Sequence, residues 1–393
     1  MERVIYDLPA NWSWAQLGKV ATLLNGRAYK KAELLDAGPT PVLRVGNFFS
    51  NRSWYYSDLD LPDEKYCDEG DLLYAWSASF GPKIWQGPRA IYHYHIWKVL
   101  TSEHIDKKFL FYLLEKDSEE IKAQGNGVGM FHATKGGMEK MLIPLPPINE
   151  QKRIVEKLDA LLTRIVIAIE HLQQSVTLAD ALSKNGLSEI FESLKDRYEV
   201  VPLSSVVKIN SGIALPKLFK NGFSDGDIPF FKVAQMNNHH ETMVEPEITF
   251  NETVAKEHKI KLFPKGSTLI PKRGGAILTN KKRMLLENAS YDSNIMGLKA
   301  DESKVSDEYL FAFMRTIDLA NFVDASTIPQ VNNKHIDQMQ IPLASIEEQT
   351  DVVSRVNLLV KKVETMNSEI QRQLDDLQAL KRSILDSAFK GQL

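Results

Sequence analysis

Residues 143–151, Ile-Pro-Leu-Pro-Pro-Ile-Asn-Glu-Gln, recur as Ile-Pro-Leu-Ala-Ser-Ile-Glu-Glu-Gln at residues 341–349. The two stretches lie 198 residues apart, and eight of twenty aligned positions are identical between 143–162 and 341–360, without a gap. Self-similarity at a long spacing indicates that one structural unit occurs twice in the chain. In both copies the repeated stretch leads into a segment of helical periodicity.

These following segments carry apolar residues at alternating steps of four and three. The first seam is Ile154, Leu158, Leu161, Ile165, Ala168, Leu172, Ser175, Ala179 and Leu182, and the second repeats it 198 residues later, from Val352 to Leu380. A period of 3.5 is typical of a coiled-coil seam, although one such stripe also fits an ordinary core helix. Two matched stripes favour two helices of about 54–66 Å that pack on each other. Ser175 and Gln373 interrupt the seams at the same place and are expected to help set the register.

The sequence upstream of each helix repeats more loosely. Gly26 follows Leu17–Val20 as Gly212 follows Leu203–Val206, and the offset between the copies then grows along the chain. Changing offsets indicate one shared fold with loops of different length. The aromatic stretch 90–99 predicts a strand, whereas residues 109–115 and 308–317 predict short helices.

The expected fold is therefore α+β, with two similar globular α/β domains joined by two long helices that form a coiled coil. The boundaries predicted for the two domains and the two helices are 1–146, 147–193, 194–342 and 343–393, in the order domain, helix, domain, helix.

Composition excludes several classes of protein. The chain has 393 residues, 43% of them hydrophobic, and its 48 basic and 51 acidic residues leave a net charge of −3. The single cysteine, Cys67, excludes an internal disulfide framework and a cysteine-based zinc cluster. No apolar run approaches the ~18 residues of a membrane span, and Glu2, Arg3 and Asp7 stand where a signal peptide is apolar. We expect a cytoplasmic protein.

Signatures of catalysis are missing from the sequence. There is no phosphate-binding loop of the Gly-x-x-x-x-Gly-Lys type, no dinucleotide-binding Gly-x-Gly-x-x-Gly after a strand, and no Asn-Pro-Pro-aromatic segment. The pairs His93/His95 and His239/His240 are too few ligands for a metal and fit polar surface or strand packing better. The sequence therefore predicts a protein that is not an enzyme, with no metal and no cofactor of its own.

Local charge, in contrast, points to nucleic acid. Residues 259–283 hold eight basic residues and no acidic one: Lys259, Lys261, Lys265, Lys272, Arg273, Lys281, Lys282 and Arg283. Lysine and arginine contacts to phosphates dominate DNA affinity, and the glycines of Pro271–Ala276 would let the backbone approach a phosphate. The alternative is a solvated loop balanced by neighbouring acids. The corresponding region of the first half offers Tyr74, Trp76, Ser77, Lys83 and Arg89 as candidate DNA contacts, with core packing as the alternative for the aromatic residues.

A second apolar stripe lies on the first helix, outside the predicted seam. It consists of Val155, Leu162, Val166 and Ile169. Exposed apolar stripes usually mark a partner surface, so these four residues are the predicted contact for another protein.

Taken together, these features resemble the specificity subunit of type I restriction–modification enzymes. The resemblance covers the whole chain and is most specific at Ile-Pro-Leu-Pro-Pro-x-x-Glu-Gln-x-x-Ile-Val-x-x-Leu-Asp, residues 143–159. Residues 325–334, Ala-Ser-Thr-Ile-Pro-Gln-Val-Asn-Asn-Lys, and the terminus 383–393 are also typical of the family. One departure is Asn185-Gly186, which stands where the second copy has Ser383-Ile384 and predicts a break or an end of the first helix.

The resemblance implies that each globular domain is a target recognition domain reading one half of a bipartite double-stranded DNA sequence. It implies that the helices pair antiparallel, hold the domains apart and dock two modification subunits. Those subunits would carry S-adenosylmethionine and methylate adenine, and a motor-nuclease subunit would join for cleavage. Two alternatives stay open, a structural coiled-coil adaptor without sequence-specific DNA recognition and an enzyme with an unrecognised active site.

Overall fold

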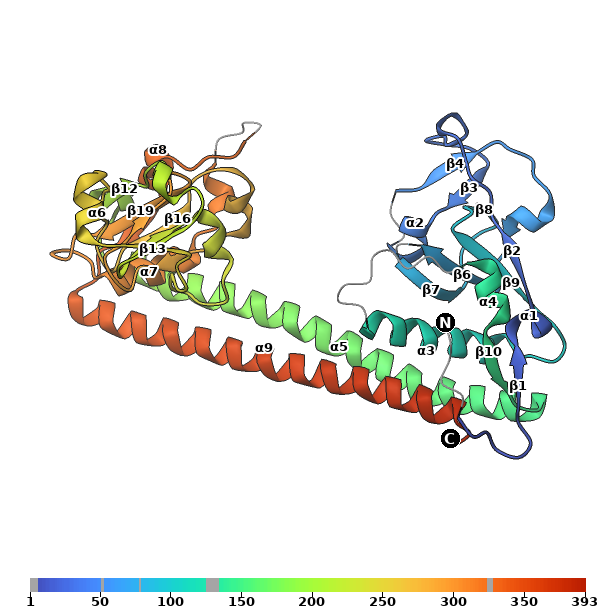
Figure 1. The fold of residues 1–393 in the computed structure, drawn as a ribbon. Coiled ribbons are helices and arrows are strands. Elements are labelled where there is room, and N and C mark those ends of the chain that lie inside the picture. Colours follow the sequence, from blue (N-terminus) through green and yellow to red (C-terminus); the bar gives the residue numbers. More distant parts are fainter. Residues whose placement is uncertain (1–5, 51–52, 78, 125–133, 324–327) are drawn as a thin grey trace. The chain divides into compact units, whose positions relative to one another are not determined.

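The computed structural model describes residues 6–50, 53–77, 79–124, 134–323 and 328–393. The chain divides into two compact units (Figure 1). Unit 1 comprises residues 1–173 together with 371–393, and unit 2 comprises residues 174–370. Each unit therefore combines one globular domain with one end of each long helix.

The domain of unit 1 contains two four-stranded sheets and a two-stranded ribbon. The antiparallel sheet has the order β2 (Ala21–Asn25), β9 (Ile96–Thr101), β6 (Leu72–Ser77) and β7 (Ser79–Ile84). The mixed sheet has the order β4 (Tyr55–Ser57), β3 (Thr40–Leu43), β8 (Ala90–Tyr92) and β5 (Tyr66–Cys67). The ribbon pairs β1 (Ser13–Gln16) with β10 (Leu142–Leu145), which brings the start of the domain to the start of the first long helix.

The domain of unit 2 repeats this plan. Its antiparallel sheet has the order β12 (Val207–Ser211), β19 (Ile295–Ala300), β16 (Thr268–Pro271) and β17 (Arg283–Met284). Its mixed sheet has the order β13 (Phe223–Asp225), β15 (Ile248–Phe250), β14 (Ile228–Phe231) and β18 (Ser290–Tyr291), and its ribbon pairs β11 (Val200–Pro202) with β20 (Gln340–Pro342). In both mixed sheets an antiparallel pair is followed by a parallel one, namely β4-β3-β8 and β15-β14-β18. The predicted internal repeat is thus visible in the strand order itself.

The two long helices are α5 (Ile148–Lys195) and α9 (Ile346–Phe389). In unit 1 the start of α5 and the end of α9 pack on α3 (Lys107–Gln124), where the Phe109 and Phe389 rings lie 5.2 Å apart. In unit 2 the end of α5 and the start of α9 pack on α7 (Asp307–Thr316), where the Phe191 and Tyr309 rings lie 5.5 Å apart. The shorter helices are α1 (Leu17–Val20), α2 (Val45–Ser50), α4 (Lys135–Lys140), α6 (Glu252–Glu257) and α8 (Asn333–Gln338).

Within unit 2 the helices run antiparallel, and α5 continues through Asn185-Gly186. Asn367 Nδ2 donates to Asp180 Oδ1 at 3.2 Å, and a Cβ at Gly186 would lie 2.9 Å from Cδ2 of Leu359. Residue numbers therefore rise along α5 as they fall along α9. The predicted break at Gly186 is wrong, because the glycine sits inside the helix where α9 approaches it closely.

The predicted period of the seams is confirmed, but their phase is only half right. Leu158, Ile165 and Ala179 are buried as expected. Leu161 and Leu182 are 37% and 58% exposed, and on α9 Leu374 is buried where Gln373 is exposed. At Leu161, Leu182 and Gln373 the seam is thus shifted by one residue, whereas the first predicted positions, Ile154 and Val352, are buried as expected. The polar layer predicted at Gln373 is therefore not in the seam.

Candidate nucleic-acid interface

One predicted aromatic residue of the first half, Trp76, and one predicted basic residue of the second, Lys272, occupy equivalent places in the two domains. In β6 Tyr74 pairs with Trp97, and in β16 Ile270 pairs with Met296 in the same register. Two residues further on, Trp76 N donates to the His95 carbonyl at 3.0 Å, and Lys272 N donates to the Asn294 carbonyl at 2.7 Å. Trp76 and Lys272 therefore mark one structural position, at the end of the strand and beside the turn that precedes β9 or β19.

A glycine brings a third segment to this position in each domain. A Cβ at Gly26 would lie 2.3 Å from the Tyr92 carbonyl oxygen, and one at Gly212 would lie 1.9 Å from that of Asp292. Only glycine allows such an approach of two backbones. We call the resulting surface the rim of each unit. The rim of unit 1 consists of Arg27, Trp76 and residues 93–95, and the rim of unit 2 consists of Ser211, Lys272–Gly275, residues 292–294 and residues 328–331.

In the rim of unit 2 the first two basic residues lie at the surface. Lys272 Nζ donates to Ser211 Oγ at 3.0 Å, and the exposed Arg273 forms an antiparallel bridge with Gln330. Gly274 N donates to the Pro329 carbonyl at 2.9 Å, which joins the basic segment to the described end of the family motif at 325–334. The motif residues 325–327 lie outside the described residues.

At position 275, in the same rim, neither the backbone conformation nor the surrounding space requires a glycine. Its φ is not positive, and a Cβ built there would meet nothing within 4 Å. The backbone at this point is therefore open to a group from outside the described chain, which fits a phosphate contacted by main-chain N–H groups.

Lys282 and Arg283 do not belong to this surface, contrary to the prediction. Both are buried, and Lys282 Nζ donates to the Ile317 carbonyl at 2.5 Å and to Asn280 Oδ1 at 2.7 Å. Arg283 donates to Oδ1 and the carbonyl of Asn238. Burial lowers the pKa of Lys282 to about 8. These two cations hold the domain together, and their charge is not presented to solvent.

The remaining basic residues fall into separate groups. Lys281 is half-buried and follows the rim of unit 2, whereas Lys259, Lys261 and Lys265 are exposed and precede β16. A strand of four residues spans about 13 Å, so the acid-free stretch is not one continuous patch. Lys261 Nζ also lies 4.9 Å from the centre of the Phe263 ring, which ties its side chain to the fold.

In unit 1 the structure places the five predicted DNA contacts in different environments. Tyr74 and Ser77 are buried, so the core alternative holds for both. Trp76 is half-buried, and its Nε1 donates to the Tyr94 carbonyl at 2.9 Å. Lys83 Nζ donates to the Phe48 carbonyl at 2.9 Å. Of the five, Trp76 is the one that reaches the rim.

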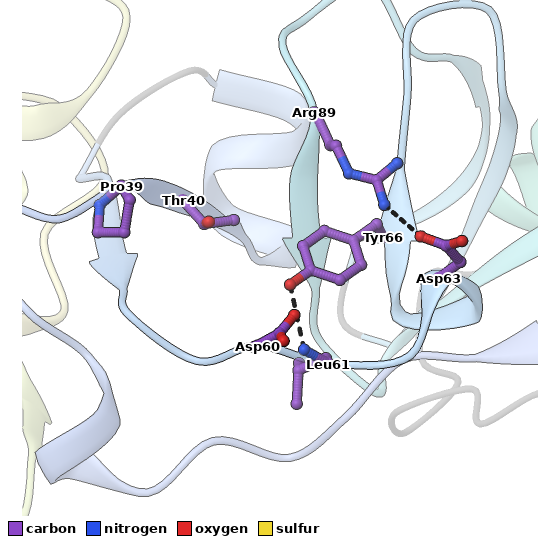
Figure 2. A pocket seen from close by; sticks show the side chains of 7 residues that line it. All are labelled: Pro39, Thr40, Asp60, Leu61, Asp63, Tyr66 and Arg89. Atoms are coloured by element: carbon purple, nitrogen blue, oxygen red, sulfur yellow. Dashed lines mark hydrogen bonds and ion pairs between the residues drawn. The ribbon is translucent and has the colours of Figure 1, made fainter.

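Arg89 is exposed but already neutralised within unit 1. Its guanidinium contacts Asp68 at 2.7 Å and Asp63 at 2.6 Å, and it lies 4.3 Å from the centre of the Tyr66 ring. The hydrogen bond to Asp68, together with that to Asp63, raises the pKa of Arg89. Figure 2 shows the arginine and Asp63 beside a cavity of about 360 Å³, where the Tyr66 hydroxyl accepts from Leu61 N. Two carboxylates at this site make a phosphate an unfavourable neighbour, so the prediction for Arg89 is not supported.

The turn 93–95, which links the two sheets of unit 1, was missed because the sequence indicated one strand over residues 90–99. The structure has two strands, β8 and β9, with His93, Tyr94 and His95 at the turn between them. Burial, and then His95 and Arg44, lower the pKa of His93 to about 4, so His93 is neutral at neutral pH. Among the described residues no group of histidines, cysteines and carboxylates could hold a metal.

The predicted partner stripe on α5 is largely buried inside unit 1. Val155 and Leu162 belong to the core around Leu158 and Phe109, and Ile169 packs against it. Of the four residues Val166 alone is exposed, at 44%. Val155, Leu162 and Ile169 were mistaken for surface because they belong to the seam itself. Other apolar residues on the long helices have exposed side chains, among them Ile167, Leu178, Leu182 and Leu358.

Comparisons with known proteins agree with the repeat. Residues 9–178 and 195–375 each match a family model described as the type I restriction modification DNA specificity domain. Over 98% of its length the chain is 24% identical to the type I restriction enzyme EcoBI specificity subunit of Escherichia coli, covering 86% of that protein. It is also 24% identical over 98% of its length to the MjaVIII specificity subunit of Methanocaldococcus jannaschii, covering 94% of it.

Two solved structures share the fold. One is a chain from a study described as the structural basis of complex assembly and conformational transition of the type I R-M system. It has a TM-score of 0.76 and 20% identity, over 99% of this chain and all of that one. The other is the HsdS subunit from Thermoanaerobacter tengcongensis, with a TM-score of 0.54 and 20% identity over the full length of both chains. In the part of the chain that the structure describes, no helix is long and apolar enough to cross a membrane.

Proposed function

Because the chain belongs to the family of type I restriction modification DNA specificity domains, we propose that it reads DNA sequence for a type I restriction–modification complex and leaves catalysis to partner subunits. The observation that carries this proposal is that the family model matches twice, once in each half of the chain. Each recognition domain, at residues 1–146 and 194–342, then reads one half of a bipartite target. The helical segments, at residues 147–193 and 343–393, set the gap between the halves.

We propose the rims as the DNA-contacting surfaces. Both contain three equivalent segments, which supports one docking geometry for both domains, and the rim of unit 2 has residues 328–331 in addition. In unit 2 Lys272, Arg273 and Lys281 contact phosphates, and the amide of Gln330 beside Arg273 lies where a base edge can be read. In unit 1 Trp76 and the turn 93–95 take the corresponding place. The exposed residues Lys259, Lys261 and Lys265 form a second, separate group of candidate phosphate contacts.

Partner subunits complete the proposed complex. Two modification subunits that bind S-adenosylmethionine dock on the helical segments, and restriction subunits join for cleavage. We retain Val166 from the predicted contact and add Leu178 and Leu182, whose exposed apolar surface on α5 suits a protein partner better than water. Val155 and Leu162 are not retained, since both are already buried.

The experiment that tests the proposal is co-expression of the full chain with the modification subunit of its own system. Stoichiometric co-purification, and adenine methylation that depends on both chains, are expected. Methylation by this chain alone would favour an enzyme. A stable complex without sequence-dependent DNA binding would favour the alternative, a structural coiled-coil adaptor.

A further inference from the structure

In unit 1 a column of aromatic rings leads from the core to the rim. The buried rings of Tyr74 and Trp97 stack with centroids 6.0 Å apart, and Trp97 stacks on Trp76 at 5.7 Å. Trp76 in turn meets Tyr94 edge to face at 6.0 Å and His95 at 4.9 Å. The column therefore ends at the turn 93–95, where Tyr94 is 39% exposed.

Tyr94 is held firmly at the end of this column. Its backbone N donates to the Arg27 carbonyl at 3.1 Å, and its carbonyl accepts from Trp76 Nε1 at 2.9 Å. Its ring lies 3.9 Å from that of His95 and 4.5 Å from that of His93. An aromatic side chain has few rotamers to lose, so a ring supported on several sides is preorganised for contact with a flat partner.

The rim of unit 1 offers aromatic surface where the rim of unit 2 offers cations. Trp76 stands at the place of Lys272, and Tyr94 precedes His95 as Ser293 precedes Asn294. The nearby guanidinium of Arg27 is paired with Glu33 at 2.7 Å, and His93 is neutral at neutral pH because burial holds its pKa at about 4. Phosphate attraction is therefore weak at this rim, whereas the face of a base exposed at a partly unstacked step of the duplex is a matched partner.

We propose that Tyr94 is a specificity-determining residue that packs its ring against a DNA base at a partly unstacked step of the half-site read by unit 1, where the ease of unstacking depends on the sequence of the step. The inference rests on the proposed function and adds to it a division of chemistry between the domains. Unit 1 recognises its half-site mainly by aromatic contact with bases. Unit 2 contributes most of the phosphate contacts, through Lys272 and Arg273.

The test uses the complex of the full chain with its modification subunit. Tyr94→Ala should weaken binding to cognate DNA by roughly 5- to 100-fold, as expected for loss of base–aromatic stacking. Tyr94→Phe should bind as the wild type does, because the ring is kept. Leu100→Ala is the matched control, since Leu100 has a similar exposure of 43% at the far end of β9. Ser293→Ala is the control at the equivalent turn of unit 2.

Two readouts separate stacking from a general structural effect. The fluorescence of 2-aminopurine, placed at successive positions of the unit 1 half-site, should change at one position when the wild type or Tyr94→Phe binds, and not when Tyr94→Ala binds. The salt dependence of binding should be the same in all these variants. An equal fluorescence change with Tyr94→Ala, or an equal loss of cognate and non-cognate binding, would overturn the proposal. Absence of any sequence-specific binding by the wild-type complex would instead refute the proposed function.

Discussion

Gln151 and Gln349, 198 residues apart, make the same three hydrogen bonds. Gln151 Nε2 donates to the carbonyls of His104 and Pro146 at 2.9 and 2.8 Å, and its Oε1 accepts from Asp106 N at 2.7 Å. Gln349 Nε2 donates to the carbonyls of Lys304 and Ala344, each at 2.9 Å, and its Oε1 accepts from Ser306 N at 2.8 Å. Each amide is buried and joins the first turn of a long helix to the loop before α3 or α7.

Replacing either glutamine should therefore destabilise its unit. Gln151→Ala or Gln349→Ala removes the partner of three backbone groups, of which the carbonyl of Pro146 or Ala344 is buried. One buried group without a partner costs about 1–3 kcal/mol. Urea unfolding should show a loss of at least that size for each variant. Lys152→Ala, at the exposed neighbouring position, is the control and should unfold like the wild type. Equal stability of Gln349→Ala and Lys152→Ala would contradict this role.

Glycine substitutions should separate folding from DNA binding in unit 2. Gly212→Ala puts a Cβ 1.9 Å from a backbone oxygen that cannot move aside, so a loss of stability is expected. Gly275→Ala meets nothing within 4 Å and should leave thermal unfolding unchanged. DNA affinity should nevertheless fall, because the added methyl keeps a phosphate from the backbone. Unchanged affinity of a folded Gly275→Ala complex would remove this backbone from the interface.

Removing the positive charges of the rim of unit 2, and that of Lys281 beside it, should alter the salt dependence of DNA binding. Each lost phosphate contact lowers the slope of log K against log salt by about 0.9. A triple change of Lys272, Arg273 and Lys281 to Gln is expected to flatten the slope, as measured by fluorescence anisotropy from low to physiological salt. Lys259, Lys261 and Lys265, changed together, form the matched set with the same loss of charge. If the first set leaves the slope intact and the second flattens it, the phosphate contacts lie at the other end of β16.

The buried Lys282 predicts that stability rises with pH. Burial lowers its pKa from 10.5 to about 8, so between these values the unfolded chain binds the proton more strongly than the folded chain does. The free energy of unfolding should therefore increase as pH rises from 8 towards 10.5, by up to about 3 kcal/mol from this group. Below pH 8 the group contributes no pH dependence. Lys282→Met should remove the rise, and the difference between variant and wild type in urea unfolding at pH 7.5 and 10 measures it.

The repeat was readable from the sequence because both copies of the Ile-Pro-Leu segment are followed by the same helical period. The phase of the seam could not be read from the sequence, since Leu161 and Leu162 are both apolar. A seam with alternating steps of four and three residues has the same period whichever step comes first. Burial of Lys282 was equally invisible, because its partners are backbone and amide groups from distant segments. Tyr94 was missed because aromatic residues 93–95 have strand propensity, whereas the backbone turns there.

The central claim, that two domains read two half-sites across a helical spacer, is tested most directly by mapping adenine methylation. The complex of the full chain with its modification subunit should methylate one bipartite sequence with a fixed gap. One heptad inserted after Leu172 and another after Ile370 keeps the 3.5-residue period and lengthens each helix by about 10 Å. At about 3.4 Å per base pair the gap should grow by roughly 3 base pairs, with both half-sites unchanged. A continuous target, or the original gap in an intact and active double-insertion complex, would contradict the account.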